Sequence, residues 1–426
     1  MTVRIQDLNQ TDSSLRLTAL ETTLREERAR GDFPQPRLFD ANNHIHTFYS
    51  FSPYSPTMAV YLAYRAGLQA AGIVDHDSLS GALEFKKAAS LAGIGATCGV
   101  EMRVRFSQGF GTLNNPDQPD CMYMVAHGVS ADQVAAFNSY LAPFRAHREE
   151  RNRRMCDNLN RLLSPEGIVI SYDCDVRPLS QAAEGGSVTE RHLLYALGSL
   201  LEKRFGRTSA LLDCLRSALK LELNPKQVRQ LTDPDNGLFA YDLLGVLKTN
   251  TRPYYEPADR EMPEASEFVE KAKEFGAIPC YAYLGDVGES VTGDKRAQKF
   301  EDGYLDRLIV ELKKIGVPAV TYMPTRNTRA QLDRIRTLCD RNGLLQISGE
   351  DINSPRQGFV CPAYADPEYR NLIETTWALI EHEASCGEKG IAYGLFGTKN
   401  QDLTLEERIT KYSRAGKARY GVKEHE

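Results

Sequence analysis

The stretch Arg37-Leu-Phe-Asp-Ala-Asn-Asn-His-Ile-His46 sets two histidines, His44 and His46, at the end of a short apolar run. If the run forms a β-strand, both imidazoles lie on one face, because side chains two residues apart in a strand point the same way. Two imidazoles side by side at a strand end are able to bind one metal ion. The chain has only eight histidines, so this pair concentrates the available ligands.

Further potential ligands follow apolar, strand-like runs downstream. They are Asp75-His76-Asp77, Gly99-Val100-Glu101 and Gly349-Glu350-Asp351. Nitrogen and oxygen ligands at the ends of separate strands are how a β/α barrel builds a metal site. The sequence therefore predicts a metal centre formed by residues far apart in the chain.

The composition is that of a soluble enzyme. Of the 426 residues, 42% are hydrophobic and 26% are charged, and the formal net charge is −5. No basic stripe is present, which argues against nucleic-acid binding. No apolar run approaches the roughly 18 residues of a membrane span, and we find no signal peptide. The nine cysteines form no Cys-x-x-Cys pair, which indicates reduced thiols and a cytoplasmic location.

Hydrophobic patterns predict an α/β fold. Before residue 130 we expect strands near 38–43, 71–75, 95–106 and 121–127, with helices at 56–69 and 79–92. After residue 263 we expect strands near 277–283, 317–323 and 343–348, with helices at 264–275, 303–315 and 328–341. Strands that alternate with helices predict a parallel sheet or barrel.

The remaining patterns are mainly helical. Long helical patterns occupy 131–163 and 189–249, with a strand-like patch at 167–171 between them. Other helices are expected at 12–31, 367–383 and 405–415. We therefore divide the chain into an N-terminal helix (1–36), a seven-stranded barrel (37–130 and 264–361), a helical insertion (131–263) and a helical C-terminal extension (362–426).

Eight segments in order resemble those of the PHP (polymerase and histidinol phosphatase) family, in the branch with a helical insertion. The segments are HIH, IVDHDSLSG, GVEMRV, YMVAHGV, RNRRMCDNLNRLL, VTERHLLYAL, FVEKAKEFGAIPCYAYLG and LCDRNGLLQISGEDIN. The first three and the last are specific in combination. The resemblance implies a distorted, TIM-like barrel of seven strands and a metal-dependent phosphoesterase with up to three metal ions.

The resemblance also implies a ligand set. It assigns one metal ion to His44, His46, Glu101 and Asp351, all of which are present. Two imidazoles and two carboxylates suit Zn, Mn or Fe(II). His127 lies four residues past a position that the resemblance assigns to a second ion, and the sequence leaves open whether it is a ligand or a histidine at the barrel rim.

The other two sites of the family are incomplete here. Tyr123 and Tyr283 stand where the resemblance implies histidine ligands of a second ion, and Phe51 and Asn353 replace ligands of a third, leaving His76. A neutral phenol is a poor ligand and a phenyl ring is none. We therefore expect one tightly bound divalent ion, with a second ion weak or absent.

Without a second and a third ion, side chains must act as the general acid and the general base. His76 is the expected general acid or base, because histidine changes charge near neutral pH. Tyr283 and Tyr123 are expected at the same mouth as proton or hydrogen-bond donors, with core packing as the alternative. Of the carboxylates flanking His76, one is expected to orient its ring and the other to cap the next helix; we assign the first role to Asp75.

Substrate-binding residues are less clear from sequence. Arg326 follows an expected strand, and Arg191 with His192 matches a family segment loosely. Both arginines suit an anion, because a guanidinium donates two hydrogen bonds to phosphate or carboxylate. Tyr123 and Asn353 complete the expected set. For each arginine a solvated surface position is the alternative.

The leading hypothesis is a metal-dependent hydrolase that acts on a small phosphate ester or another anionic metabolite through metal-activated water. A mononuclear lyase, isomerase or non-phosphate hydrolase on the same barrel is the first alternative. A non-catalytic binding protein that retains a metal ion is the second. The sequence leaves a homo-oligomer open.

Overall fold

A computed structural model describes residues 5–286 and 301–422. Its centre is one seven-stranded sheet with the strands in chain order, as expected. The strands are β1 (Arg37–Ile45), β2 (Leu68–His76), β3 (Gly95–Arg105), β4 (Cys121–His127), β5 (Ile278–Tyr283), β6 (Ala319–Tyr322) and β7 (Leu345–Ser348). Four strands precede the long helical segment and three follow it.

The sheet closes into a distorted barrel between β1 and the segment after β7. The backbone N–H of His46 donates to Ile352 O at 2.9 Å, and the N–H of Ile352 donates to His44 O at 3.1 Å. These bonds bring the residues around position 351 against the histidine pair. The first and last parts of the barrel thus meet at the predicted site.

The expectation of an entirely parallel sheet is wrong at β4. This strand runs antiparallel to both β3 and β5, whereas the other neighbouring pairs are parallel. A parallel pair needs a crossover connection, usually a helix, whereas an antiparallel pair needs only a returning loop. Residues 106–120 between β3 and β4 form no helix, so β4 returns beside β3.

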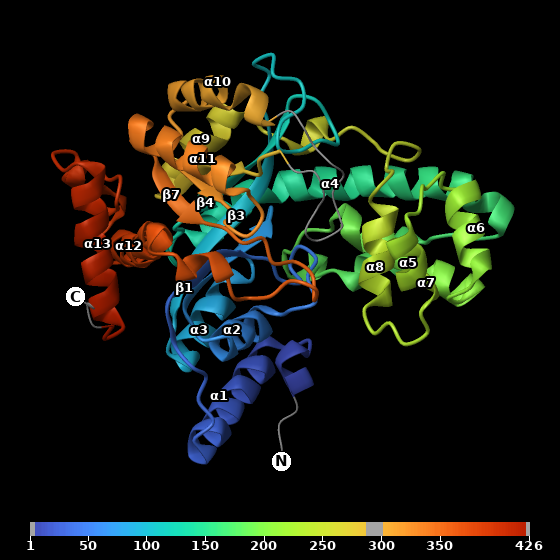
Figure 1. Cartoon of the computed structure of the whole chain (residues 1–426), viewed down its shortest axis with the longest axis horizontal. Coiled ribbons are helices and arrows are strands. Elements are labelled where there is room, and N and C mark those ends of the chain that lie inside the picture. The colour runs from blue at the N-terminus through green and yellow to red at the C-terminus, as the bar shows by residue number, and fades with distance from the viewer. Residues whose placement is uncertain (1–4, 287–300, 423–426) are drawn as a thin grey trace.

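Helices surround the barrel (Figure 1). They are α1 (Ser13–Arg30), α2 (Pro56–Arg65), α3 (Ala82–Ala92), α9 (Ala265–Glu274), α10 (Glu301–Lys314) and α11 (Arg329–Asn342). Local sequence explains their ends. The Ser55 hydroxyl accepts from the third amide of α2, and Thr328 with Gln331 forms a capping box at α11. Helix α11 ends at Gly343, whose φ of 62° suits a residue without Cβ.

The segment between β4 and β5 is mainly helical and has its own apolar core. It contains α4 (Val134–Leu163), α5 (Glu190–Phe205), α6 (Ser209–Ser217), α7 (Pro225–Thr232) and α8 (Phe239–Leu247). Figure 1 shows α5 to α8 grouped to one side of the barrel, with α4 reaching between the two. Buried leucines such as Leu197, Leu201 and Leu243 pack together there, separately from the barrel's core.

The strand predicted at 167–171 is absent. Ile168 and Ile170 are buried in the helical core, which explains the strand-like pattern of this patch. The side chain of Asn160 takes the place of a partner strand: it accepts from the N–H of Ile170 at 2.7 Å and donates to its carbonyl at 2.9 Å.

The C-terminal segment packs on the barrel. Its helices are α12 (Arg370–Lys389) and α13 (Leu405–Arg419). Asn43 of β1 donates to Thr376 of α12 at 2.7 Å, and Trp377 approaches Gly95, the first residue of β3. Helix α12 therefore covers the end of the barrel at which β3 begins. Within the described ranges, no helix has the length and apolar character needed to cross a membrane.

Buried ion pairs join the helical segment to the barrel. Glu261, 2% exposed, accepts from Arg103 of β3 at 2.7 Å and from Arg151 of α4 at 2.8 Å. Arg148 of α4 lies 3.4 Å from the same carboxylate. Burial alone would raise the pKa of Glu261, but these three guanidiniums hold it below its usual value. Glu261 is therefore a negative charge surrounded by three buried cations.

We expect Glu261→Gln to lower the free energy of unfolding by about 3 kcal/mol, because removal of one partner leaves buried charges uncompensated. The control is Glu150→Gln, since Glu150 is an exposed partner of Arg154 and Arg260. It should cost at most about 1 kcal/mol. Urea denaturation measures both, and equal losses would show that the buried pairs do not stabilise the fold.

Candidate metal centre

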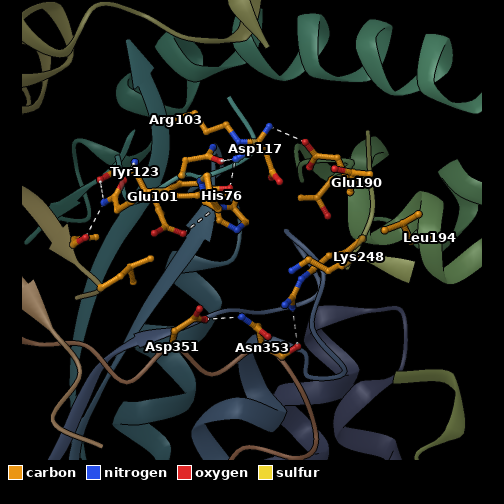
Figure 2. Close-up of a pocket in the computed structure, with 18 of the residues that line it drawn as sticks. His76, Glu101, Arg103, Asp117, Tyr123, Glu190, Leu194, Lys248, Asp351 and Asn353 are labelled. Carbon is orange, nitrogen blue, oxygen red and sulfur yellow. Dashed lines mark hydrogen bonds and ion pairs between the residues drawn. The ribbon is translucent and has the colours of Figure 1, made fainter. Parts of the chain in front are cut away.

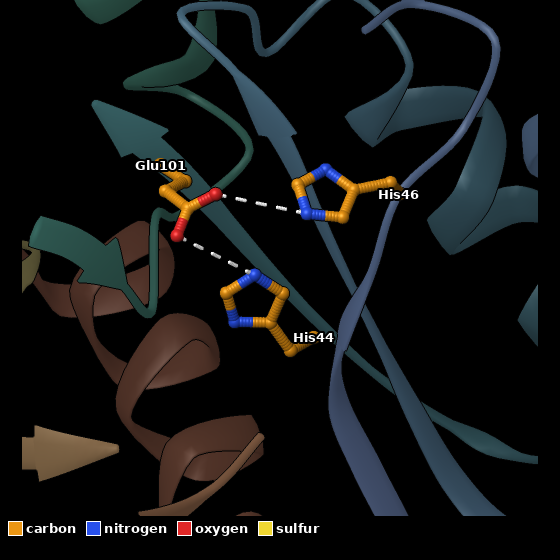
Figure 3. Close-up of side chains that lie close together, drawn as sticks. All are labelled: His44, His46 and Glu101. Carbon is orange, nitrogen blue, oxygen red and sulfur yellow. Dashed lines mark ion pairs between the residues drawn. The ribbon is translucent and has the colours of Figure 1, made fainter. Parts of the chain in front are cut away.

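Three side chains with metal-binding atoms converge at the barrel mouth (Figure 3). His44 lies at the end of β1, His46 follows it, and Glu101 comes from β3. His44 Nε2 is 3.8 Å from Glu101 Oε1, and His46 Nε2 is 3.7 Å from Glu101 Oε2. One ligand atom from each lies within 4.8 Å of the other two. All three residues are buried.

This spacing is close to, and slightly wider than, that of two ligands on one divalent ion. Zinc binds nitrogen and oxygen ligands at about 2.0–2.2 Å, so two ligands of a tetrahedral ion lie roughly 3.3–3.6 Å apart. Burial alone would raise the pKa of the Glu101 carboxyl, but the nearby His76 and His44 rings hold it well below its usual value. The buried carboxylate therefore carries the charge that a cation requires.

Asp351 lies beside this triad. Its Oδ1 is 3.4 Å from His46 Nε2 and accepts from Asn353 Nδ2 at 2.6 Å. Burial alone would raise its pKa, but His46 and His44 lower it. Asp351 thus lies beside the triad and contacts His46, but it is not part of the close group formed by His44, His46 and Glu101.

A serine and an aspartate orient His46. Ser50 Oγ donates to Asp75 Oδ1 at 2.6 Å and lies 3.3 Å from His46 Nδ1. Because that donation uses the serine proton, Ser50 meets Nδ1 as an acceptor, which leaves the lone pair of His46 on Nε2. Burial, with the neighbouring His76, lowers the pKa of His46 to about 3, so the ring is neutral, as a ligand must be.

The catalytic role expected of Asp75 therefore finds no support in its contacts. Its carboxylate has no hydrogen bond to His76 among the described residues and accepts from Thr47 N and Thr47 Oγ1, each at 2.6 Å. These bonds hold the loop after β1. Asp75 acts on the site only through Ser50 and His46.

His76, at the end of β2, does reach the site. Its Nδ1 is 3.0 Å from Glu101 Oε2, and its ring centroid is 4.7 Å from that of His46. A carboxylate only accepts, so this contact favours the proton on Nδ1 and leaves Nε2 as the acceptor.

A cavity of about 440 Å³ opens above these residues (Figure 2). Tyr123, Arg191, Asn353 and Tyr283 are among the residues that line it. Arg191 Nη1 donates to Asn353 O at 3.5 Å, which joins α5 to the loop after β7. The Tyr283 hydroxyl is engaged, because it donates to Asp302 at 2.6 Å.

Two predicted binding residues do not line the cavity. Arg326 turns to Leu284, where its Nε donates to the carbonyl at 3.3 Å. His192 is buried, and its Nδ1 accepts from Thr189 N at 3.0 Å in a capping box at the start of α5. Its ring packs against Phe51 at 5.0 Å between centroids. His192 is thus structural, and Arg326 supports a loop.

Other cavity residues escaped the sequence analysis. They include Arg103, Asn114, Arg148, Lys248 and Arg252. Arg103 had a signal, because it follows Glu101 by two positions in β3 and so shares its face. The others come from loops and from α4, where no strand periodicity marks them.

Residues 42–194 match the PHP domain family. The chain contains a PHP domain. The match runs from β1 into α5 and includes the two paired histidines, His76 and Glu101, whereas Asp351 lies beyond it. The matched residues thus contain all three members of the triad: His44 on β1, His46 directly after it and Glu101 on β3.

The chain is similar to two solved structures. A protein provisionally described as a metal-dependent phosphoesterase, from Bifidobacterium adolescentis, is 19% identical, with a TM-score of 0.50 over 79% of this chain and 98% of that chain. An amidohydrolase from Chromobacterium violaceum is 18% identical, with a TM-score of 0.48 over 78% and 96%. No curated protein matches the chain.

His127 lies inside the barrel without a ligand role in the triad. It is fully buried on β4, across from Gly99. Neither ring nitrogen has a hydrogen-bond partner within residues 5–286 and 301–422. Burial, with the nearby His44, lowers the pKa of His127 to about 3. The alternative that His127 lies at the rim of the barrel is therefore wrong, because its ring is fully buried.

Ser50→Ala should weaken divalent metal binding about 10- to 100-fold, because His46 loses the acceptor that keeps its proton on Nδ1. Ser52→Ala is the matched control, since the Ser52 hydroxyl has no hydrogen-bond partner in the described parts of the chain. Calorimetric titration with Zn or Mn measures both, and we expect one tight equivalent in the unaltered protein. Equal affinity in Ser50→Ala would exclude this role for Ser50.

His192→Gln should reduce the acid sensitivity of the fold. Burial lowers the pKa of His192 to about 3, whereas an unfolded histidine titrates near 6.5. Between those values only the unfolded chain binds the proton, so stability is full above pH 6.5 and falls as the pH drops toward 3. Glutamine preserves the capping box.

Between pH 7 and pH 5 the variant should lose about 2 kcal/mol less stability than the unaltered protein. Urea denaturation at both pH values measures the difference. An unchanged pH dependence would mean that His192 is already charged in the folded protein.

Proposed function

We propose that the chain is a metal-dependent hydrolase of the PHP superfamily that cleaves small phosphate monoesters. The observation that carries the proposal is the buried cluster of His44, His46 and Glu101, with Asp351 and His76 beside it, at the base of a cavity. The name given to one protein of similar fold, a metal-dependent phosphoesterase from Bifidobacterium adolescentis, agrees with this proposal.

The charge of the cavity favours an anion. Its basic lining residues are Arg103, Arg148, Arg191, Lys248 and Arg252. Of the acidic residues that line it, Glu101 and Asp351 would be neutralised by a bound cation, which leaves Asp117 and Glu190. Arg103 and Arg148 already pair with Glu190, Glu261 and Asp77. The excess of basic over acidic side chains around the remaining space therefore comes from Arg191, Lys248 and Arg252. Guanidiniums bind phosphate by paired hydrogen bonds, which suits a phosphorylated metabolite.

The dimensions of the cavity favour a metabolite over a polymer. Pockets for small molecules occupy about 300–1,000 Å³, and this cavity of about 440 Å³ lies within that range. We therefore propose that the cavity binds a small anionic metabolite, and that the protein binds neither nucleic acid nor a membrane.

A divalent ion bound to the triad would polarise a phosphoryl oxygen and make water a better nucleophile. In this proposal His76 supplies the base: its Nε2 accepts a proton from the attacking water, and its Nδ1 lies 3.0 Å from Glu101 Oε2. Arg191 of α5 lines the cavity, and in this proposal its guanidinium binds the phosphate group.

His76→Gln should lower kcat for phosphate monoesters by about 10²- to 10⁴-fold while the metal content stays the same. Phosphate release with Mn or Zn and elemental analysis measure the two effects. The control is Arg326→Ala, since Arg326 lies outside the cavity, and its kcat should not change.

Failure to hydrolyse any phosphate monoester with these metals would overturn the proposal. Turnover of amides or lactones alone would favour the mononuclear, non-phosphate alternative. Thermal stabilisation by anionic metabolites without turnover would favour a binding protein.

A further inference from the structure

The hydroxyl group of Tyr123 accepts a hydrogen bond from Arg103 and can still donate one. Tyr123 of β4 pairs in register with Arg103 of β3, so both side chains lie on the same face of the sheet. Arg103 Nε donates to the Tyr123 hydroxyl oxygen at 3.2 Å. Because a guanidinium only donates, the tyrosine oxygen is the acceptor in this bond. The hydroxyl proton of Tyr123 is therefore still able to form a hydrogen bond with another group. No residue of the described chain accepts that proton, and Tyr123 lines the cavity.

Arg103 is held in this position from three sides. Its Nη1 donates to Glu190 of α5 at 2.6 Å and to Glu261 at 2.7 Å, and the residue is 4% exposed. Its guanidinium also lies 5.6 Å from the centre of the Tyr123 ring. Arg151 of α4 bonds the same two glutamates, which fixes them in turn. These contacts hold the Arg103 side chain in the position from which its Nε–H donates to Tyr123.

Tyr123 also stands next to the base of the proposed reaction. Its ring centroid is 5.6 Å from that of His76, and the two rings border one cavity (Figure 2). Burial raises the pKa of Tyr123 well above its usual value, so the phenol keeps its proton until a stronger base forms beside it. The oxygen of a departing alcohol is such a base.

We infer that Tyr123 is the proton donor to the leaving oxygen of the phosphate ester, and that Arg103 is the residue that positions it. The inference rests on the proposed function. It assigns acid and base to two neighbouring rings, Tyr123 and His76. It also gives Arg103 a role that neither the domain match nor the ligand set provides.

The step balances as a hydrolysis. The oxygen of water forms a bond to phosphorus, and His76 takes one proton of that water. The bond between phosphorus and the alcohol oxygen breaks, its electron pair stays on that oxygen, and the Tyr123 proton joins it. The phenolate left behind is stabilised by the Arg103 Nε–H. A proton passing from His76 to Tyr123 restores the site, so the products are the alcohol and inorganic phosphate.

The test compares leaving groups in Tyr123→Phe. A propyl phosphate releases a strongly basic alcohol and needs the proton, whereas p-nitrophenyl phosphate releases a weakly basic phenol and does not. With the metal-loaded protein, kcat for propyl phosphate should fall about 100-fold or more, and kcat for p-nitrophenyl phosphate should fall less than about threefold. Melting temperature and metal content confirm that the variant is folded and loaded.

Arg103→Met should show the same selective loss, and it should add nothing in the Tyr123→Phe background if Arg103 acts only through the tyrosine. Tyr283→Phe is the comparison variant, because Tyr283 lines the same cavity but its proton is donated to Asp302. It should not distinguish the two substrates.

The outcomes separate the inference from the proposed function. If the unaltered protein hydrolyses neither ester, the proposed function fails. If it hydrolyses both and Tyr123→Phe slows both equally or neither, the proposed function stands and the inference is overturned. A selective loss in Tyr283→Phe instead would also overturn it. Should Arg103→Met fail to fold, the Tyr123→Phe comparison still decides the identity of the donor.

Discussion

Two backbone hydrogen bonds make the metal centre possible. The exchange between His44, His46 and Ile352 joins β1 to the segment that follows β7, about 300 residues later in the chain. Because these bonds involve the peptide groups of the histidine pair itself, Asp351 has little freedom in its approach to His46. The arrangement of ligands is thus set by the closure of the sheet and not by the side chains alone, and α12 supports this closure through Asn43 and Thr376.

The buried ion pairs around Glu261 tie the helical segment to that barrel. Arginines at this depth are costly to bury unless they are paired, and each of Arg103, Arg148 and Arg151 lies against a carboxylate. Arg148 also contacts Asp77, the residue after His76, at 3.0 Å. Helix α4 therefore contacts the same mouth that the strands form. The cavity has walls from both parts of the chain, which explains how an inserted segment affects chemistry at a barrel strand.

Much of the fold followed from local patterns, which also marked candidate ligands at the ends of strand-like runs, whereas the resemblance to the PHP family selected the four assigned to one ion. The triad was predictable because His44 and His46 obey the two-residue period of a strand, and Glu101 ends a run of the same kind. The direction of β4 was not, since a buried strand has the same pattern whichever way it runs. Ile168 and Ile170 resembled a strand because both are buried, although Asn160 provides their partner.

Loop residues were the least predictable. Arg326 follows β6 and was expected at the mouth, but its backbone N–H bonds Met323 O in a turn that directs the side chain to Leu284. His192 was a binding candidate because Arg191-His192 loosely matches a family segment, whereas in the structure it completes a capping box with Thr189. The position of Arg103 at the cavity could be predicted from the alternation of side chains along β3. The position of Lys248 could not, because it depends on where α8 ends.

The position of α12 has a consequence for biosynthesis. While the chain is being made, β1 can pair with β2 early, but its other edge stays open until residue 352 emerges, and the base of the barrel stays uncovered until α12 follows. An open strand edge is a template for association with other chains. The nascent chain therefore exposes a strand edge that can pair with other chains until residue 352 has emerged, and the packing of α12 then completes the barrel.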